Sequence, residues 1–229
     1  MSVIATNLQA VQRRIDEAAR AVGRNPETVG LLAVSKTWPA SAVEEAARAG
    51  QRAFGENYVQ EAVDKIGLLR DAGLEWHFIG PLQSNKTRLV AENFSWVHSI
   101  ERGKIAERLS AQRPVGLPPL QVCVQVNVSG EASKSGCAPA EAAELCRRVA
   151  ALPNLRLRGL MAIPEPVEGS DAQRRPFRQL RELFETLRSG GLPLDTLSMG
   201  MSHDLEAAVA EGATMVRIGT AIFGERNYL

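Results

Sequence analysis

The chain alternates short runs of β-branched and other apolar residues with longer stretches in which apolar residues recur at helical spacing. In one such stretch Val59, Val63 and Ile66 fall at positions i, i+4 and i+7, so that they share one face of a helix. Strands that alternate with helices pair in parallel, because each helix returns the chain to the same edge of the sheet. We predict eight strands, at residues 29–36, 52–55, 76–80, 96–100, 120–128, 155–163, 196–199 and 215–223.

The number of strand–helix units distinguishes two folds that share this local pattern. Eight units in 229 residues match an α/β fold of the (β/α)8 TIM-barrel type, whose usual size is about 250 residues. The alternative is an open, doubly wound sheet, but the chain has no Gly-x-Gly-x-x-Gly turn of the kind that dinucleotide-binding sheets carry. Only residues 224–229 follow the last strand, so an additional N-terminal helix, predicted at residues 8–22, is expected to replace the last helix of the ring. We expect residues 1–229 to form a single domain.

The amino-acid composition excludes some classes of binding partner. The chain has 27 Lys and Arg against 26 Asp and Glu, a net charge of +1. This charge is too small to attract nucleic acid or an anionic membrane. The first residues lack the apolar core of a signal peptide, and no apolar run approaches the ~18–20 residues of a membrane span. Three cysteines without metal-type spacing indicate free thiols in a reducing compartment. We therefore expect a cytoplasmic protein without a metal site that handles a small molecule.

Polar residues and glycines gather at the carboxyl ends of the predicted strands, where a barrel of this kind builds its sites. Lys36 shares one face of the first strand with Leu32 and Val34, so its amine is expected at the mouth of an apolar barrel. In such a place desolvation lowers the pKa of an amine and frees it to form an imine with a carbonyl compound. The alternative is a lysine that ends its strand by reaching into water.

The segments that follow the last two strands predict an anion site. Ser202 is placed to cap a helix predicted at residues 203–211, and Gly200 lets backbone amides approach an anion there. Gly219 and Thr220, at the end of the last strand, add a second amide-rich turn and a hydroxyl. Together these groups would form a phosphate cradle. A capped helix and a tight turn without a ligand is the alternative reading.

Arg217 completes the chemical pattern. It lies two residues before Gly219 and shares its face, and a guanidinium inside a barrel is costly unless it meets an anion or a strong acceptor. If it points outward instead, it forms a salt bridge between the barrel and the helices. An imine-forming lysine, a phosphate cradle and an interior arginine together suggest pyridoxal 5′-phosphate (PLP), with its aldehyde on Lys36 and its ring nitrogen facing Arg217.

Five segments of the chain carry a resemblance to a known family. They are Ala33-Val-Ser-Lys36, Phe54-Gly-Glu-Asn-Tyr-Val-Gln-Glu61, Trp76-His-Phe-Ile-Gly-Pro-Leu-Gln-Ser-Asn-Lys86, Ser198-Met-Gly-Met-Ser202 and Val216-Arg-Ile-Gly-Thr-Ala-Ile-Phe-Gly224. In this order they resemble the pyridoxal phosphate homeostasis protein family, which is similar to the N-terminal barrel domain of alanine racemase. The resemblance covers nearly the whole chain. It implies a PLP barrel of fold type III in which Lys36 carries the cofactor as a Schiff base.

The resemblance also implies the other cofactor contacts and a role. The implied contacts are Asn57, Ser202, Arg217, Gly219 and Thr220, with Met201 and His77 nearby. The implied role is that of a carrier or regulator of the PLP pool, acting in vitamin B6 and amino-acid homeostasis without an established turnover. PLP-dependent apo-enzymes are the expected recipients, and the family suggests a monomer or a weak homodimer.

Two other functions stay open at this point. A single-domain PLP-dependent amino-acid racemase would need a second acid–base group opposite the lysine, usually a tyrosine from a second domain. We expect no such domain, and the sequence places neither Tyr58 nor Tyr228 to serve, so a non-catalytic carrier is predicted. A cofactor-free aldolase that binds a sugar phosphate through Lys36 is the other possibility. Lys134 either lies near the phosphate or is a solvated loop lysine, and Lys86 either approaches the anion or belongs to an ordinary helix start.

Overall fold

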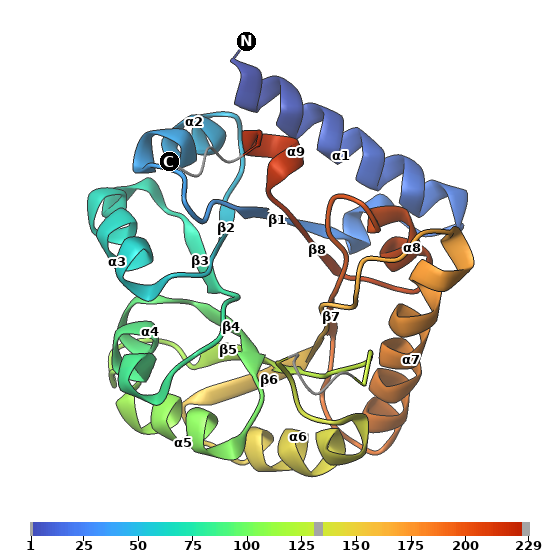
Figure 1. Ribbon diagram of the computed structural model, residues 1–229. Helices are drawn as coiled ribbons and strands as arrows, with labels where there is room; N and C mark the ends of the chain where they lie inside the picture. Colours follow the sequence, from blue (N-terminus) through green and yellow to red (C-terminus); the bar gives the residue numbers. More distant parts are fainter. Residues whose placement is uncertain (1, 131–134, 226–229) are drawn as a thin grey trace.

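The computed structural model describes residues 2–130 and 135–225, so Lys134 and Tyr228 lie outside the described residues. Within these ranges eight parallel strands close into a barrel in sequence order, with β8 pairing with β1 (Figure 1). The strands are β1 (Gly30–Val34), β2 (Ala53–Glu56), β3 (Glu75–Phe78), β4 (Trp96–Ile100), β5 (Leu120–Gln125), β6 (Leu155–Met161), β7 (Thr196–Ser198) and β8 (Met215–Ile218). The predicted (β/α)8 barrel is confirmed.

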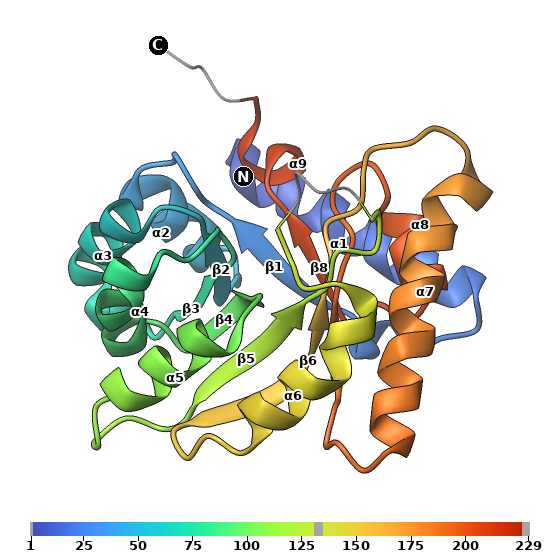
Figure 2. The same ribbon diagram turned by 60° about the horizontal axis from the view of Figure 1, so that its bottom comes forward.

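Helices surround the barrel, and Figure 2 shows them outside the strands. They are α1 (Val3–Ala21), α2 (Ala40–Arg48), α3 (Val59–Leu68), α4 (Thr87–Asn93), α5 (Gly103–Gln112), α6 (Ala142–Ala150), α7 (Ser170–Ser189), α8 (Leu205–Ala210) and α9 (Thr220–Phe223). Short 3-10 turns lie at η1 (Pro26–Thr28), η2 (Arg70–Ala72), η3 (Ser84–Lys86) and η4 (Pro139–Glu141). None of the described helices combines the length and apolar character needed to cross a bilayer.

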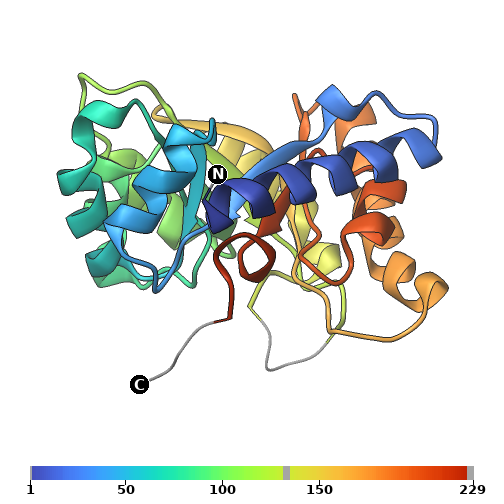
Figure 3. The ribbon, with the colours of Figure 1, turned by 90° about the horizontal axis from the view of Figure 1, so that it is seen from above.

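The N-terminal helix α1 covers the end of the ring, as predicted, but a short helix, α9, also follows the last strand. Helix α1 packs on α8, α9 and α2, and Figure 3 shows it along the outside of the barrel. Its apolar stripe, which includes Leu8, Val11 and Ile15, is buried, because these side chains recur at helical spacing on the face that meets the barrel. Asn7 Nδ2 donates to the carbonyl of Ile222 at 2.9 Å and so ties α1 to α9.

Six of the eight strands end earlier than the sequence pattern predicts, and the difference matters most for the first and the last. The first strand was expected to reach residue 36, but β1 ends at Val34, because Thr37 turns the chain with a φ of 69°. The last strand was expected to reach residue 223, but β8 ends at Ile218 and α9 begins at Thr220. Both corrections place polar residues on loops at the mouth of the barrel.

The interior of the barrel is only partly apolar. Leu32, Val34 and Ile79 form one small cluster inside it, and Trp96, Cys123 and Met161 form another. Four buried polar side chains also lie within this part of the fold: His77, His98, Ser198 and Arg217. Since buried polar groups are stable only when hydrogen-bonded, their partners matter for the site.

The three cysteines are free and buried. Burial raises the pKa of the Cys123 and Cys146 thiols to about 12 and that of Cys137 to about 11. These thiols are therefore protonated at neutral pH, a form that neither binds metal well nor attacks carbonyls. Among the described residues no group of three His, Cys, Asp or Glu side chains comes together to hold a metal ion.

Candidate cofactor site

A cavity of about 220 Å³ lies at the carboxyl ends of the strands. Its walls come from segments that follow most of the strands: Val34, Lys36, Asn57, Ile79, Ile163, Met201, Ser202, His203, Arg217, Gly219 and Thr220. Every residue predicted for the cofactor site is in this lining except Gly200 and His77. A second cavity, of about 330 Å³, shares Lys36, Asn57, Ile79 and Ile163 with the first and extends to Gln125 and Ser135.

Lys36 reaches this cavity because of the alternation along β1. Leu32 and Val34 point into the barrel, where they pack against Ile79, and Lys36 follows on the same side just beyond the strand. Its side chain is half-buried and lines both cavities. The structure places Lys36 in the wall of the cavity at the barrel mouth, as predicted, but the interior below it is only partly apolar.

Arg217 is buried inside the barrel, and the outward alternative is wrong. Its Nη1 donates to Ser198 Oγ and its Nη2 to the carbonyl of Ala162, both at 2.9 Å. Burial lowers the pKa of Arg217 to about 10, so the guanidinium stays cationic at neutral pH. A fixed positive charge in the cavity wall favours an anion or an acceptor nitrogen beside it.

The loop between β7 and α8 differs from the prediction in one respect. Ser202 does not cap the helix: α8 starts at Leu205, and its N-cap residue is Asp204, whose Oδ1 accepts from the amide of Met201 at 2.6 Å. This turn keeps Ser202 in the cavity wall. Arg14 of α1 holds the loop from outside by donating to the carbonyl of Ser202 at 2.7 Å. The N-terminal helix therefore helps to shape the site.

Gly200 lies behind the cavity wall, which corrects its predicted role at the anion. Its φ is +97°, and a Cβ built on it would lie 2.5 Å from the Cβ of Ala208. Only glycine combines this conformation with such close packing against α8. Gly200 therefore fixes the path of the loop, while Met201 and Ser202 line the cavity.

Gly219 and Thr220 supply the second set of donors. Gly219 follows β8 and Thr220 starts the short helix α9, in which the amides of Ile222 and Phe223 donate to the carbonyl of Gly219. The Thr220 side chain is exposed and lines the cavity together with Ser202. Two hydroxyls and a guanidinium in the wall of one cavity fit a phosphate-bearing ligand, and the lysine amine in the same wall fits an aldehyde.

Asn57 enters the site from the segment after β2. A Cβ built on Gly80 would lie 2.4 Å from the carbonyl oxygen of Asn57 and 2.8 Å from its Oδ1. The missing side chain at Gly80 is therefore what lets the Asn57 segment approach β3. This close approach places Asn57 in the walls of both cavities.

His77 lies deeper than predicted and does not line the cavity. Ile79, two residues further along the same face of β3, occupies the wall instead, which leaves His77 one layer below. His77 is fully buried; its Nδ1 lies 2.9 Å from Nε2 of His98 and its Nε2 lies 2.8 Å from Oε1 of Glu75. Lys86, at the end of η3, is also outside the cavity lining.

Ser198 and His98 were not predicted to take part in the site, but both contact the chain of polar groups that reaches Arg217. His98 Nδ1 lies 2.7 Å from Ser198 Oγ, which in turn accepts from Arg217. The sequence did contain one indication of these contacts: each of the two polar side chains lies within a short strand that is otherwise buried. Such a side chain needs a buried partner, but the sequence does not say which one.

Comparisons with known proteins agree with this geometry. The family model described as alanine racemase, N-terminal domain, matches residues 6–227. The pyridoxal phosphate homeostasis protein of Pseudomonas aeruginosa is 66% identical over 228 residues, which cover 100% of this chain and 98% of that protein. This chain belongs to the pyridoxal phosphate homeostasis protein family. The resemblance found in the five segments is thereby confirmed.

Other members and a solved structure extend the comparison. The pyridoxal phosphate homeostasis protein of Escherichia coli K12 is 59% identical over 231 residues, covering 100% of this chain and 99% of that one. The structure of PipY from Synechococcus elongatus PCC7942 with PLP bound is 39% identical, has a TM-score of 0.84 and covers 96% of this chain and 100% of that chain.

Proposed function

We propose that this protein binds PLP in the cavity at the barrel mouth, holds it covalently on Lys36 and takes part in intracellular PLP and amino-acid homeostasis. The observation that carries the proposal is that Lys36 lines the same cavity as three donor side chains, those of Ser202, Arg217 and Thr220. The names of the related proteins and the PLP-bound structure of PipY support the same ligand.

Each residue has a distinct task in this proposal. The neutral amine of Lys36 adds to the aldehyde, and its two hydrogens leave with the aldehyde oxygen as one water molecule, so that a C=N bond (a Schiff base) replaces C=O. Ser202 and Thr220 donate hydrogen bonds to the phosphate, together with the amides at the start of α9. When bound, PLP supplies a reactive aldehyde on an electron-withdrawing ring. A cationic Arg217 beside the ring nitrogen disfavours protonation of that nitrogen and so weakens the ring as an electron sink.

A carrier role fits the site better than racemisation. A racemase needs an acid–base group on the face of the ring opposite the lysine. Tyr58 is 53% exposed, and no tyrosine of the described residues lines the cavity. We propose that the protein holds the cofactor without turnover and releases it to PLP-dependent apo-enzymes in the cytoplasm.

Borohydride trapping tests covalent binding at Lys36. Purified protein is incubated with PLP, reduced, digested and mapped by mass spectrometry, beside the variants Lys36→Ala and Lys104→Ala. Lys104 is an exposed lysine on α5 and serves as the matched control. We expect a pyridoxyl group on the peptide that contains Lys36, its loss in Lys36→Ala and its retention in Lys104→Ala. A pyridoxyl adduct that persists on other lysines at the same yield in Lys36→Ala would refute the assignment.

Two further measurements separate the alternatives. Exchange of the α-hydrogen of alanine with deuterated solvent, present in the native protein and lost in Lys36→Ala, would establish a racemase; a carrier shows none. An adduct with the mass of a sugar phosphate in protein isolated without added PLP would establish an aldolase. Recovery of activity by an apo-enzyme mixed with the loaded protein is the result that a carrier predicts.

A further inference from the structure

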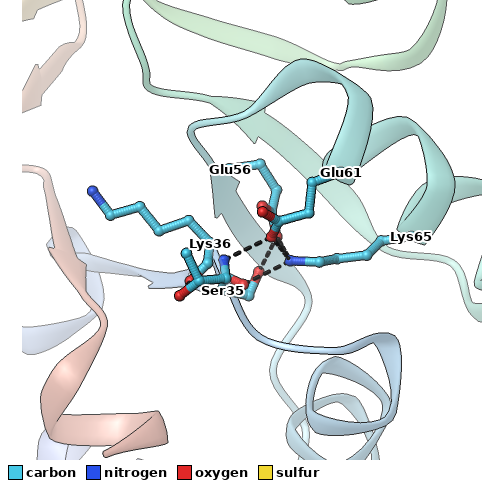
Figure 4. Close-up of polar contacts among 6 residues, drawn as sticks. Ser35, Lys36, Glu56, Glu61 and Lys65 are labelled. Carbon is cyan, nitrogen blue, oxygen red and sulfur yellow. Dashed lines mark hydrogen bonds and ion pairs between the residues drawn. The ribbon is translucent and has the colours of Figure 1, made fainter. Parts of the chain in front are cut away.

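A buried ionic cluster holds the chain on both sides of Lys36. Its members are Glu56 at the end of β2 and Glu61 and Lys65 on α3 (Figure 4). Figure 4 shows the cluster next to Ser35, while the side chain of Lys36 points away from it. The cluster also contacts Thr37, whose amide donates to Oε1 of Glu61. The residue that lines the cavity thus lies between two residues that the cluster contacts.

Ser35, which precedes Lys36, makes four hydrogen bonds through three of its atoms. Its amide donates to the carbonyl of Gly55 at 3.0 Å, and its Oγ donates to Oε1 of Glu56 at 2.6 Å. Its carbonyl accepts from Nζ of Lys65 at 2.7 Å and from the amide of Trp38 at 3.0 Å. The amide, the carbonyl and the hydroxyl of Ser35 are therefore all held by hydrogen bonds.

Thr37, which follows Lys36, has an uncommon backbone conformation. With a φ of 69°, it is the one non-glycine residue with positive φ among the described residues. A side chain with a branched Cβ disfavours this region, so the surrounding contacts must hold it there. The amide of Thr37 donates to Oε1 of Glu61 at 2.6 Å, a contact that fixes this turn.

Lys65 connects the two sides of the cluster. Its Nζ lies 2.8 Å from Oε1 of Glu56 and 2.6 Å from Oε1 of Glu61, in addition to the carbonyl of Ser35. Three acceptors match the three hydrogens of the ammonium group. The Lys65 side chain is only 6% exposed and that of Glu56 is fully buried. Burying this ion pair costs desolvation free energy, which apolar side chains at the same positions would not.

We propose that Lys65 is a positioning residue for the covalent capture of the cofactor: through Ser35, Glu56 and Glu61 it fixes the backbone beside Lys36 so that the amine meets the aldehyde. This inference rests on the proposed function. A cluster that served stability alone could be replaced by packed apolar residues. Its hydrogen bonds instead end on the two neighbours of Lys36, one of which is held in a strained conformation.

The test separates covalent capture from binding. The rate of Schiff-base formation with PLP is followed by absorbance. The affinity for pyridoxine 5′-phosphate, which has an alcohol in place of the aldehyde, is measured by calorimetry. We expect Lys65→Met to slow capture by roughly 10- to 100-fold, because a small misplacement of a reacting group costs that much, and to leave the affinity for the alcohol unchanged. Lys104→Met is the matched control and should capture PLP at the native rate.

A second pair of variants keeps the test decisive if Lys65→Met does not fold. Glu61 is 31% exposed at the edge of the cluster. Glu61→Ala removes the acceptor for the Thr37 amide and should slow capture, whereas Glu61→Gln keeps an acceptor oxygen and should restore most of the rate. Native capture rates in both Lys65→Met and Glu61→Ala would overturn the inference, as would an equal loss of capture and of affinity for the alcohol. If capture also persists in Lys36→Ala, the proposed function itself has failed.

Discussion

His98 on β4 and Ser198 on β7 are hydrogen-bonded across the interior of the barrel, with 2.7 Å between His98 Nδ1 and Ser198 Oγ. On one side this contact continues to Arg217 in the cavity wall. On the other side it continues through His77 to Glu75, whose side chain is half exposed. A line of hydrogen-bonded side chains therefore joins the cavity at the barrel mouth to the outside of the barrel through its core.

The two buried histidines should make stability fall in mild acid. Burial lowers the pKa of His77 and lowers that of His98 well below 6.5, so both are neutral in the folded protein at neutral pH. Below about pH 6.5 the unfolded chain takes up protons that the folded chain does not, and the free energy of unfolding decreases. Urea unfolding at about pH 7.5 and about pH 5.5 should show this decrease, and it should be smaller in His98→Asn. His203→Asn, which changes an exposed histidine, should keep the full decrease; an identical decrease in His98→Asn would contradict the account.

Arg217→Lys should weaken both the fold and the site. A lysine ammonium cannot bond Ser198 Oγ and the Ala162 carbonyl with the planar fork that Arg217 uses, so one buried acceptor loses its partner. We expect the free energy of unfolding to fall by about 1–3 kcal/mol, together with weaker PLP binding. Urea unfolding and PLP titration measure the two effects. Arg13→Lys, on the exposed face of α1, should change neither.

Glu211 should contribute more to the free energy of unfolding than an ordinary surface carboxylate does. It is 2% exposed and accepts from Arg174 and Arg178 of α7 at 2.8 and 3.1 Å, with Arg181 at 3.2 Å. Burial acts to raise the pKa of Glu211, but the hydrogen bonds from Arg178 and Arg174 outweigh it and keep the pKa below 4.5. The stabilisation is therefore present above about pH 4.5 and is lost as the pH falls below it.

The matched experiment compares Glu211, which binds α7 from outside, with Glu185, which lies on α7 itself. Glu211→Gln should lower the free energy of unfolding at neutral pH by about 1–3 kcal/mol, since it removes hydrogen bonds to a charged group. Glu185→Gln breaks only an exposed pair with Arg181 and should cost less than about 1 kcal/mol. Equal costs for the two variants would show that α7 does not depend on Glu211.

Gly80→Ala should disturb the site through Asn57. The added Cβ would lie 2.4 Å from the backbone oxygen of Asn57, so the segment after β2 must move away from the cavity. We expect weaker PLP binding in titrations. Gly67→Ala is the control, because nothing lies within 4 Å of its added Cβ and it sits inside α3. That variant should bind PLP normally and gain about 0.5–1 kcal/mol of stability; normal binding by Gly80→Ala would show that Asn57 has no role.

Much of the fold and part of the site follow from local patterns in the chain. Side chains alternate along a strand, so Lys36 shares the inward face of Leu32 and Val34, and this was enough to place it at the barrel mouth. The alternation of strands and helices was enough to predict the barrel. The helix start after β7 was predicted two residues early, at Ser202, because Ser and Asp are both good N-caps and the sequence does not say which one the turn selects. His77 was placed one layer too high for a related reason: strand periodicity gives the face of a residue and leaves its depth undetermined.

The periodicity of the sequence was enough to predict the eight strand–helix units and the strand faces that point inward. It also singled out Lys36, Arg217, Ser202 and Thr220 as residues of the site. Only the tertiary structure decided which distant side chains meet. Lys65 reaches Ser35 from 30 positions away and His98 reaches Ser198 from 100 positions away. Periodicity reports on a single element, whereas such contacts depend on how barrel closure sets one strand or helix against another. The residues that hold Lys36 and Arg217 in place therefore became visible only in the folded chain.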